Sequence, residues 1–159
     1  MPQNDDQAKK GKTQIPTETD WGSYASDLDQ KYAHEYFAGR SNEEMQPHFR
    51  HNPIEATSEL GFMPEVPFRY YMLGLRDFVM SSDFQPLDAS DAASCFLRLI
   101  LEKLKSQPNH IVPVMPELLP AIRYVVNNQA KFEAAEKIYG NFRETLAQIE
   151  SLFAGSGAS

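Results

Sequence analysis

The chain has 159 residues, of which 42% are hydrophobic and 23% are charged, and this composition is typical of one folded domain rather than of a disordered chain. Fifteen Lys and Arg residues against twenty-two Asp and Glu residues give a formal net charge of -7, which argues against nucleic acid as a partner. The only cysteine, Cys95, excludes an internal disulfide and a zinc site made of several thiolates.

Membrane association is not expected, because the sequence has no apolar run near the length of a membrane span. The first twenty residues also contain no hydrophobic segment that would act as a secretory signal. We therefore predict a cytoplasmic protein.

The two ends of the chain differ from the rest in composition. Residues 1–19 are polar and contain one isolated branched aliphatic residue, Ile15, so we predict a flexible tail there. Residues 154–159 are small and include two glycines, and we predict a second flexible end. A helical domain is expected between them, over residues 20–153.

The first predicted helix covers residues 20–38, with Asp20 as its cap and Gly39 at its end. Its apolar residues recur at four-residue steps: Tyr24, Leu28, Tyr32 and Tyr36. A second helix is predicted to begin at Ser41, which together with Glu44 matches the capping box. Pro47 is expected to keep this helix short or bent.

The stretch from Gly61 to Met80, GFMPEVPFRYYMLGLRDFVM, concentrates aromatic residues and methionines. Its prolines predict an extended entry followed by a helix from Pro67 to Ser81. Apolar residues lie on more than one side of this helix, since Tyr70 and Met80 fall outside the main stripe. The helix must therefore pack against two neighbours or expose an apolar patch, and the sequence leaves both alternatives open.

The remaining sequence predicts further helices. Residues 88–107 form a broad apolar face, as expected of a central helix. Another helix is predicted to begin near Pro116 or Pro120, and a last one to cover residues 129–153, either separate from it or continuous with it. The one short β-like run, residues 110–114, contains Pro113, which argues against a strand. We predict a single compact all-α domain of five or six helices.

Short catalytic and cofactor motifs are absent: there is no GxGxxG, P-loop, nucleophile elbow or paired zinc motif. His48 and His51 are three positions apart, but Pro47 and Pro53 make this segment a poor scaffold for metal ligands. We expect no cofactor and no metal ion. Because enzymes without short motifs exist, the sequence favours a non-enzymatic protein without requiring one.

Acidic residues are concentrated just before the aromatic stretch. Residues 41–60 hold Glu43, Glu44, Glu55 and Glu59 against Arg50, a local charge of -3. An acidic rim beside an apolar surface is suited to docking a basic protein. We therefore predict a protein-binding protein of the adaptor, inhibitor or immunity-like kind. The predicted partner-binding residues are Glu43, Glu44, Glu55, Glu59, Tyr70 and Met80.

A rival interpretation is an enzyme or small-ligand sensor with a pocket between helices. Arg69 and Arg76 are seven positions apart on one helix face, where two guanidinium groups could hold a carboxylate or phosphate. A histidine, His34 or His48, would complete such a site. A homodimer joined through the last helix is a third interpretation.

Overall fold

The computed structural model describes residues 14–157, and every regular element within that range is helical, with no β-strand. The α-helices are α2 (Leu28–Phe37), α3 (Gln46–His51), α4 (Pro53–Gly61), α5 (Glu65–Ser81), α6 (Ala89–Ser106), α7 (Pro108–Ile111), α8 (Met115–Asn127), α9 (Glu136–Tyr139) and α10 (Phe142–Gly155). Short 3-10 helices are η1 (Glu18–Trp21), η2 (Tyr24–Ser26) and η3 (Val112–Val114). The all-α prediction is confirmed. The prediction of five or six helices is wrong, because several predicted segments are broken into shorter ones.

The predicted helix over residues 20–38 begins later than expected. Gly22 has a φ of 61°, a left-handed conformation that interrupts a helix. The helix α2 starts after Asp27, whose carboxylate accepts hydrogen bonds from the backbone N–H groups of Asp29 and Gln30. Asp20 instead belongs to η1, where its carboxylate accepts from the Thr17 backbone N–H at 2.8 Å.

The folded domain also begins before Asp20. Residues 1–13 of the predicted tail lie outside the described residues. In the following segment Pro16 is buried and Glu18 begins η1. At the other end α10 continues to Gly155, two residues beyond the predicted end of the domain, and residues 158–159 also lie outside the described part of the chain.

The contacts of the capping box at Ser41 are present, but the helix predicted to begin there is not: residues 42–45 form a turn, and the next helix begins at Gln46. The Ser41 backbone N–H donates to the Glu44 carboxylate at 2.9 Å, and the Glu44 N–H donates to the Ser41 hydroxyl at 3.1 Å. The following helix, α3, is six residues long, with Pro47 in its first turn. A new helix, α4, starts directly afterwards, because Asn52 caps it by accepting from the Glu55 N–H at 3.1 Å.

Both faces of α5 are buried, which answers the question posed by the aromatic stretch. The helix packs against α3, α4, α6, α7 and α8. Its buried side chains belong both to the main apolar stripe and to the side of the helix that carries Tyr70. They are Phe68, Tyr70, Tyr71, Met72, Leu73, Leu75, Phe78 and Val79. Met80, at the C-terminal end, is 42% exposed. The aromatic residues and methionines of this stretch are thus mainly core.

The helix α6 occupies a central position, as predicted, and its bounds lie within one residue of the expected 88–107. It contacts α4, α5, α7 and α10. Ile100 and Phe96 are completely buried on its apolar face. The charged side chain of Lys103 is also buried on this helix.

The C-terminal third consists of separate helices. Pro116 lies in the first turn of α8, Pro120 lies inside it, and the helix ends at Asn127. The long last helix predicted over residues 129–153 is broken into α9 and α10 by Gly140, which has a φ of 78°. The Gln129 side chain holds this break together: its amide donates to the carbonyls of Ala134 and Gly140, and its oxygen accepts from the Phe142 N–H.

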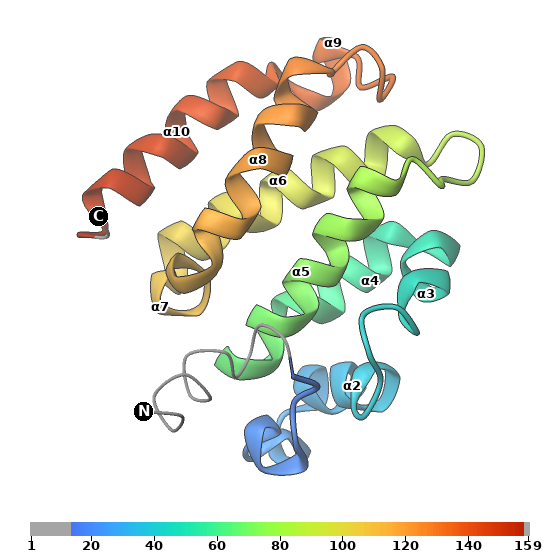
Figure 1. The fold of residues 1–159 in the computed structure, drawn as a ribbon, viewed down its shortest axis with the longest axis vertical. Helices are drawn as coiled ribbons and strands as arrows, with labels where there is room; N and C mark the ends of the chain where they lie inside the picture. The colour runs from blue at the N-terminus through green and yellow to red at the C-terminus, as the bar shows by residue number, and fades with distance from the viewer. Residues whose placement is uncertain (1–13, 158–159) are drawn as a thin grey trace.

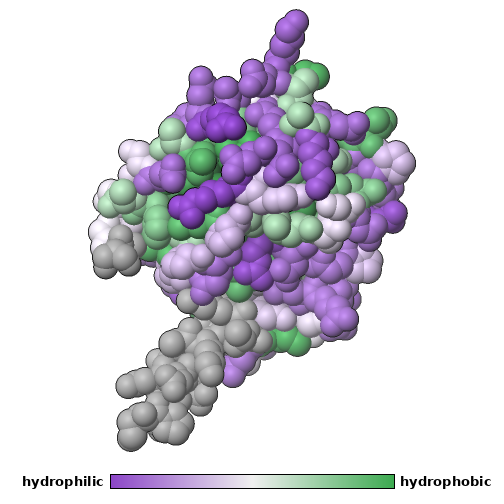
Figure 2. Space-filling model, turned by 45° about the horizontal axis from the view of Figure 1, so that its top comes forward, coloured by the Kyte–Doolittle hydropathy of each residue, from purple (hydrophilic) through white to green (hydrophobic). Residues whose placement is uncertain are grey.

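Figure 1 shows α2 at one end of the molecule and α9 at the other, with α5 and α6 between them. On the face shown in Figure 2, hydrophilic residues cover most of the surface, and hydrophobic residues emerge between them in the upper left of the view. Within residues 14–157, no helix is both long enough and apolar enough to cross a bilayer.

Candidate functional site

Large hydrophobic side chains are exposed together on α2 and α4. Leu28, Tyr32 and Tyr36 project from α2, Ile54 projects from α4, and Phe62 is the C-cap residue directly after α4. The exposed fractions of the tyrosines are 52% and 42%, and those of Ile54 and Phe62 are 52% and 46%. Isolated surface hydrophobics are common, but a group gathered on two neighbouring helices is typical of an interaction surface.

The tyrosine row of α2 faces solvent because a parallel row takes the core side. Ala33 and Phe37 are fully buried, and they have the same four-residue spacing as Tyr32 and Tyr36, one position further along. Adjacent helix positions are rotated by about 100°, so only one of the two rows can face α5 and the core. The row that contains Tyr32 and Tyr36 therefore faces solvent.

A groove of about 390 Å³ runs between α2 and α4. The residues that matter for its chemistry are Asp29, Tyr32, Tyr36, Glu55, Glu59 and Phe62. A smaller hollow of about 180 Å³ continues from it along α2 and is lined by Leu28, Lys31, Tyr32 and Glu35. Four carboxylates and one lysine therefore line the two hollows, and they surround an aromatic and aliphatic centre. We call these two hollows together the α2–α4 groove.

One wall of the α2–α4 groove is held by a hydrogen bond between His48 and Glu59, next to Tyr36. The Nε2 atom of His48 lies 2.7 Å from the Glu59 carboxylate, and Glu59 is only 6% exposed. The Tyr36 ring stacks on the His48 ring with the centroids 5.0 Å apart. The His48–Glu59 pair therefore holds the Tyr36 side chain in place. A side chain that is already ordered loses less conformational entropy when a partner binds.

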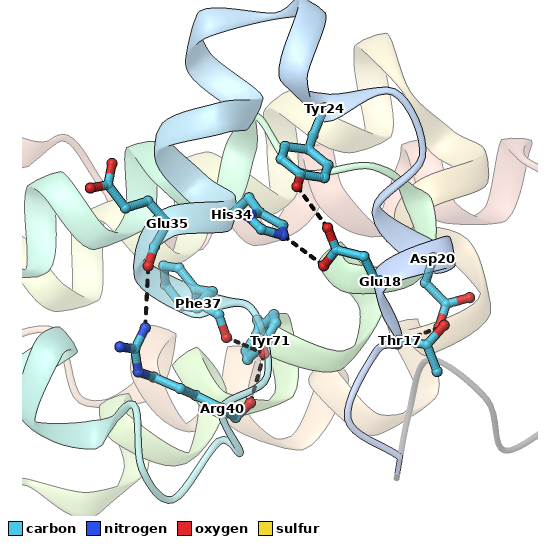
Figure 3. A network of polar contacts seen from close by, with 9 residues as sticks. All are labelled: Thr17, Glu18, Asp20, Tyr24, His34, Glu35, Phe37, Arg40 and Tyr71. Carbon is cyan, nitrogen blue, oxygen red and sulfur yellow. Dashed lines mark hydrogen bonds and ion pairs between the residues drawn. The ribbon is translucent and has the colours of Figure 1, made fainter.

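A second histidine–carboxylate pair holds the other side of α2 (Figure 3). The Nε2 atom of His34 lies 2.8 Å from the Glu18 carboxylate, which also accepts a hydrogen bond of 2.6 Å from the Tyr24 hydroxyl. The Tyr24 ring stacks on His34 at a centroid distance of 3.7 Å. The hydrogen bond from His34 is the main cause that lowers the pKa of Glu18. These contacts attach η1 and η2 to α2.

The C-terminal end of α2 is anchored to the core by Tyr71. Its hydroxyl lies 2.6 Å from each of the carbonyl oxygens of Phe37 and Arg40. Both contacts are drawn in Figure 3. The Arg40 guanidinium folds back onto the carbonyls of Glu35 and Tyr36. Burial is the main cause that raises the pKa of Tyr71, and its hydroxyl stays protonated as a donor. The helix that carries Tyr32 and Tyr36 is therefore fixed at both ends.

The structure separates the predicted partner-binding residues. Glu55 is exposed and Glu59 is paired with His48, and both line the α2–α4 groove. Glu43 and Glu44 are exposed on the turn after α2, outside the lining of the groove, and the Glu44 carboxylate is used in the capping box. The predicted rim is thus reduced from four glutamates to two.

The two predicted apolar anchors are not part of the α2–α4 groove. Tyr70 is buried, and its hydroxyl accepts a hydrogen bond from the Asn42 backbone N–H at 3.1 Å, so it is not an exposed contact residue. Met80 is exposed at the end of α5 but does not line the groove.

The alternative pocket residues do not converge. Arg69 donates to the His110 carbonyl at 3.2 Å and pairs with Glu65 at 2.5 Å. Arg76 pairs with Asp77 at 2.9 Å and donates to the Glu117 carbonyl of α8. His34 and His48 belong to the two separate carboxylate pairs described above, one with Glu18 and one with Glu59. In the described part of the chain, these four residues therefore connect different elements and do not form a common site.

The described residues contain no cluster of three or more His, Cys, Asp or Glu side chains that could hold a metal ion. His110 lies against Phe68, and burial is the main cause that lowers its pKa. Cys95 is partly buried, and desolvation raises the pKa of its thiol, which makes it a poor nucleophile.

Tyr32, Tyr36, Ile54 and Phe62 are exposed although the sequence did not predict them as surface residues. A usable signal was present on α2, because Asp29, Lys31 and Glu35 flank the tyrosine row on both sides of the helix. No comparable signal marks Ile54 and Phe62, whose exposure depends on how α4 packs between α2 and α6.

Comparison with known proteins does not assign the chain to a family. No protein-family model matches the chain, and no curated protein or solved structure shows significant similarity to it.

Proposed function

We propose that this chain is an intracellular, non-enzymatic protein that binds another protein through the α2–α4 groove. One observation carries the proposal: Leu28, Tyr32, Tyr36 and Phe62 are all exposed, and all line the acidic α2–α4 groove. Tyrosines supply a large contact area at low entropic cost and are frequent in the centres of interfaces. Intracellular location and a homodimer through α10 stay predictions from the sequence.

The partner expected from this chemistry is a basic segment with apolar anchors. Asp29, Glu35, Glu55 and Glu59 line the α2–α4 groove against the single cation Lys31. Lysine or arginine side chains of a partner would be attracted by the exposed carboxylates, while apolar side chains would fill the space between Tyr32, Tyr36 and Phe62.

The test is selection of peptides from a random display library against the immobilised protein. We expect the selected peptides to combine basic residues with large apolar ones. Tyr32→Ala and Phe62→Ala should each weaken their binding about tenfold or more, mainly through faster dissociation. Met80→Ala is the matched control, because it removes an exposed apolar side chain outside the α2–α4 groove.

Charge provides a second, kinetic readout. Glu55→Lys reverses an exposed carboxylate of the α2–α4 groove, so it should slow association and weaken the salt dependence of binding. Glu43→Lys makes the same change outside the groove and should have a smaller effect. The proposal fails if the selected peptides are acidic, or if they bind the Tyr32→Ala and Phe62→Ala variants as tightly as the original protein.

A further inference from the structure

A second hollow lies on an adjacent side of α4, between that helix and α6. This cleft has a volume of about 370 Å³, which falls within the range of small-molecule sites. Its apolar wall includes Ile54, Phe62 and Leu99. Its charged residues are Arg98, Glu102 and Lys103, which give a local charge of +1 in a chain whose net charge is -7.

Arg98 presents an available guanidinium to this cleft. The residue is exposed, and its guanidinium makes one long contact of 3.4 Å with the Ser94 hydroxyl. Within residues 14–157, no carboxylate lies at ion-pair distance from Arg98. The planar fork of its N–H donors matches the two oxygens of a carboxylate.

Lys103 adds a buried cation beside Arg98. Its ammonium donates to the Gly61 carbonyl at 2.7 Å and to the Gln107 side-chain oxygen at 2.5 Å, and it lies 5.0 Å from the centre of the Phe68 ring. These partners are neutral, and in the described part of the chain no carboxylate lies at ion-pair distance from the ammonium. The residue is 4% exposed, and desolvation is the main cause that lowers its pKa.

We propose that the α4–α6 cleft binds a small organic carboxylate with an apolar arm. The carboxylate would pair with Arg98, and the arm would lie along Ile54, Phe62 and Leu99. A monoanion is favoured over a phosphate dianion, because Glu102 lines the same cleft and would repel the second negative charge. This site is distinct from the α2–α4 groove, although Ser58 and Phe62 line both.

Binding of a carboxylate in the cleft should change the pKa of Lys103 in a direction that binding of an uncharged apolar ligand would not. A negative charge in the cleft favours the ammonium form, so the carboxylate raises the pKa of Lys103 toward its ordinary value. A neutral ligand would leave that pKa unchanged or lower it by further desolvation. The titration of Lys103 therefore distinguishes an anionic ligand from a hydrophobic one.

The test is an NMR titration of the full chain with 4-phenylbutyrate as the probe. Saturable shifts are expected for Ile54, Phe62 and Leu99, with weaker binding of 4-phenylbutanol, which lacks the charge, and of inorganic phosphate, which lacks the arm. Arg98→Gln should weaken binding about tenfold or more, as loss of a charge-assisted hydrogen-bond pair does. Arg123→Gln is the matched control, since Arg123 is an exposed arginine on α8.

A pH titration of the Lys103 side-chain carbon resonances, with and without the probe, gives the second readout. The proposal predicts a higher pKa of Lys103 in the presence of 4-phenylbutyrate. It is overturned if no binding saturates at millimolar probe, if Arg98→Gln and Arg123→Gln bind equally, or if the alcohol or phosphate binds as well as the carboxylate. An unchanged Lys103 titration under saturating probe overturns it too. Tyr32→Ala should leave probe binding intact, so this result is independent of the peptide experiment.

Discussion

Tyr71 is the residue whose single hydroxyl most directly connects the core to the surface helix α2. That hydroxyl lies 2.6 Å from each of two carbonyl oxygens at the end of α2, those of Phe37 and Arg40. Tyr71→Phe removes this donor, so the Phe37 carbonyl loses the hydrogen bond from Tyr71 but keeps the one from the Arg40 backbone N–H at 3.1 Å. We expect the free energy of unfolding to fall by about 0.5–1.5 kcal/mol, as for the loss of a typical intramolecular hydrogen bond. Denaturant unfolding measures this, and Tyr32→Phe, which changes an exposed hydroxyl, is the control. Equal losses for both variants would contradict the anchoring role.

Glu18 makes stability depend on acid pH in a defined direction. The pKa of its carboxyl is lowered in the folded protein, mainly by the hydrogen bond from His34. The carboxylate therefore stabilises the fold above its ordinary pKa of about 4.3, and this contribution is lost as the pH falls through the lower folded-state value. Glu18→Gln should be less stable than the original protein at neutral pH, with the difference shrinking below about pH 4. Thermal unfolding across pH tests this against Glu43→Gln, and a difference that grew on acidification would contradict it.

At the scale of the elements, the contact between α5 and the turn before α3 requires Gly74. The Asn42 side chain donates to the Tyr70 carbonyl at 2.8 Å and crosses α5 directly above Gly74. A Cβ atom at position 74 would lie 2.3 Å from the Asn42 side-chain oxygen, so Gly74→Ala must push this turn away. We expect a loss of about 1–3 kcal/mol in the free energy of unfolding, as for other overpacked sites.

Gly61→Ala provides the matched control for that substitution. A Cβ atom there would lie 3.4 Å from the end of the flexible Leu99 side chain, within reach of a small adjustment. The variant should unfold with nearly unchanged or slightly increased stability, because alanine favours the helix. A Gly74→Ala protein as stable as Gly61→Ala would show that the Asn42 turn moves freely.

The elements that the sequence predicts well are those set by local signals. The bounds of α6 depend on one broad apolar face and are found in the structure. The contacts of the Ser41–Glu44 box are found too, but they close a turn, and α3 begins only at Gln46. The start of α2 was predicted wrongly because Asp20 and Asp27 are equally suitable caps. Only the left-handed backbone at Gly22 decides between them.

Candidate-site residues were harder to predict because exposure is decided by contacts between distant segments. Tyr70 is buried because the turn at Asn42, 28 positions earlier in the chain, packs on it. Glu59 was predicted as an exposed rim residue, but it is buried because His48 of α3 forms a hydrogen bond with its carboxylate. Contacts between such distant residues cannot be predicted from the spacing of apolar residues in the sequence.

For the molecule as a whole, the segment before α2 acts as part of the fold. Pro16 is buried, Glu18 bonds to both His34 and Tyr24, and Trp21 is 1% exposed with its ring against His34. Since Trp21 is the only tryptophan in the chain, its fluorescence reports directly whether η1 stays in place.

Two truncated proteins isolate the contribution of residues 14–18, because both lack residues 1–13. The protein that starts at residue 19 should melt a few degrees below the one that starts at residue 14, since a loss of 1 kcal/mol corresponds to about 2–4 °C for a chain of this size. Its tryptophan emission should also shift to longer wavelength, because loss of Glu18 and Pro16 frees η1 and lets water reach Trp21. Identical melting temperatures and emission spectra would show that α2 and the core hold Trp21 without the preceding segment.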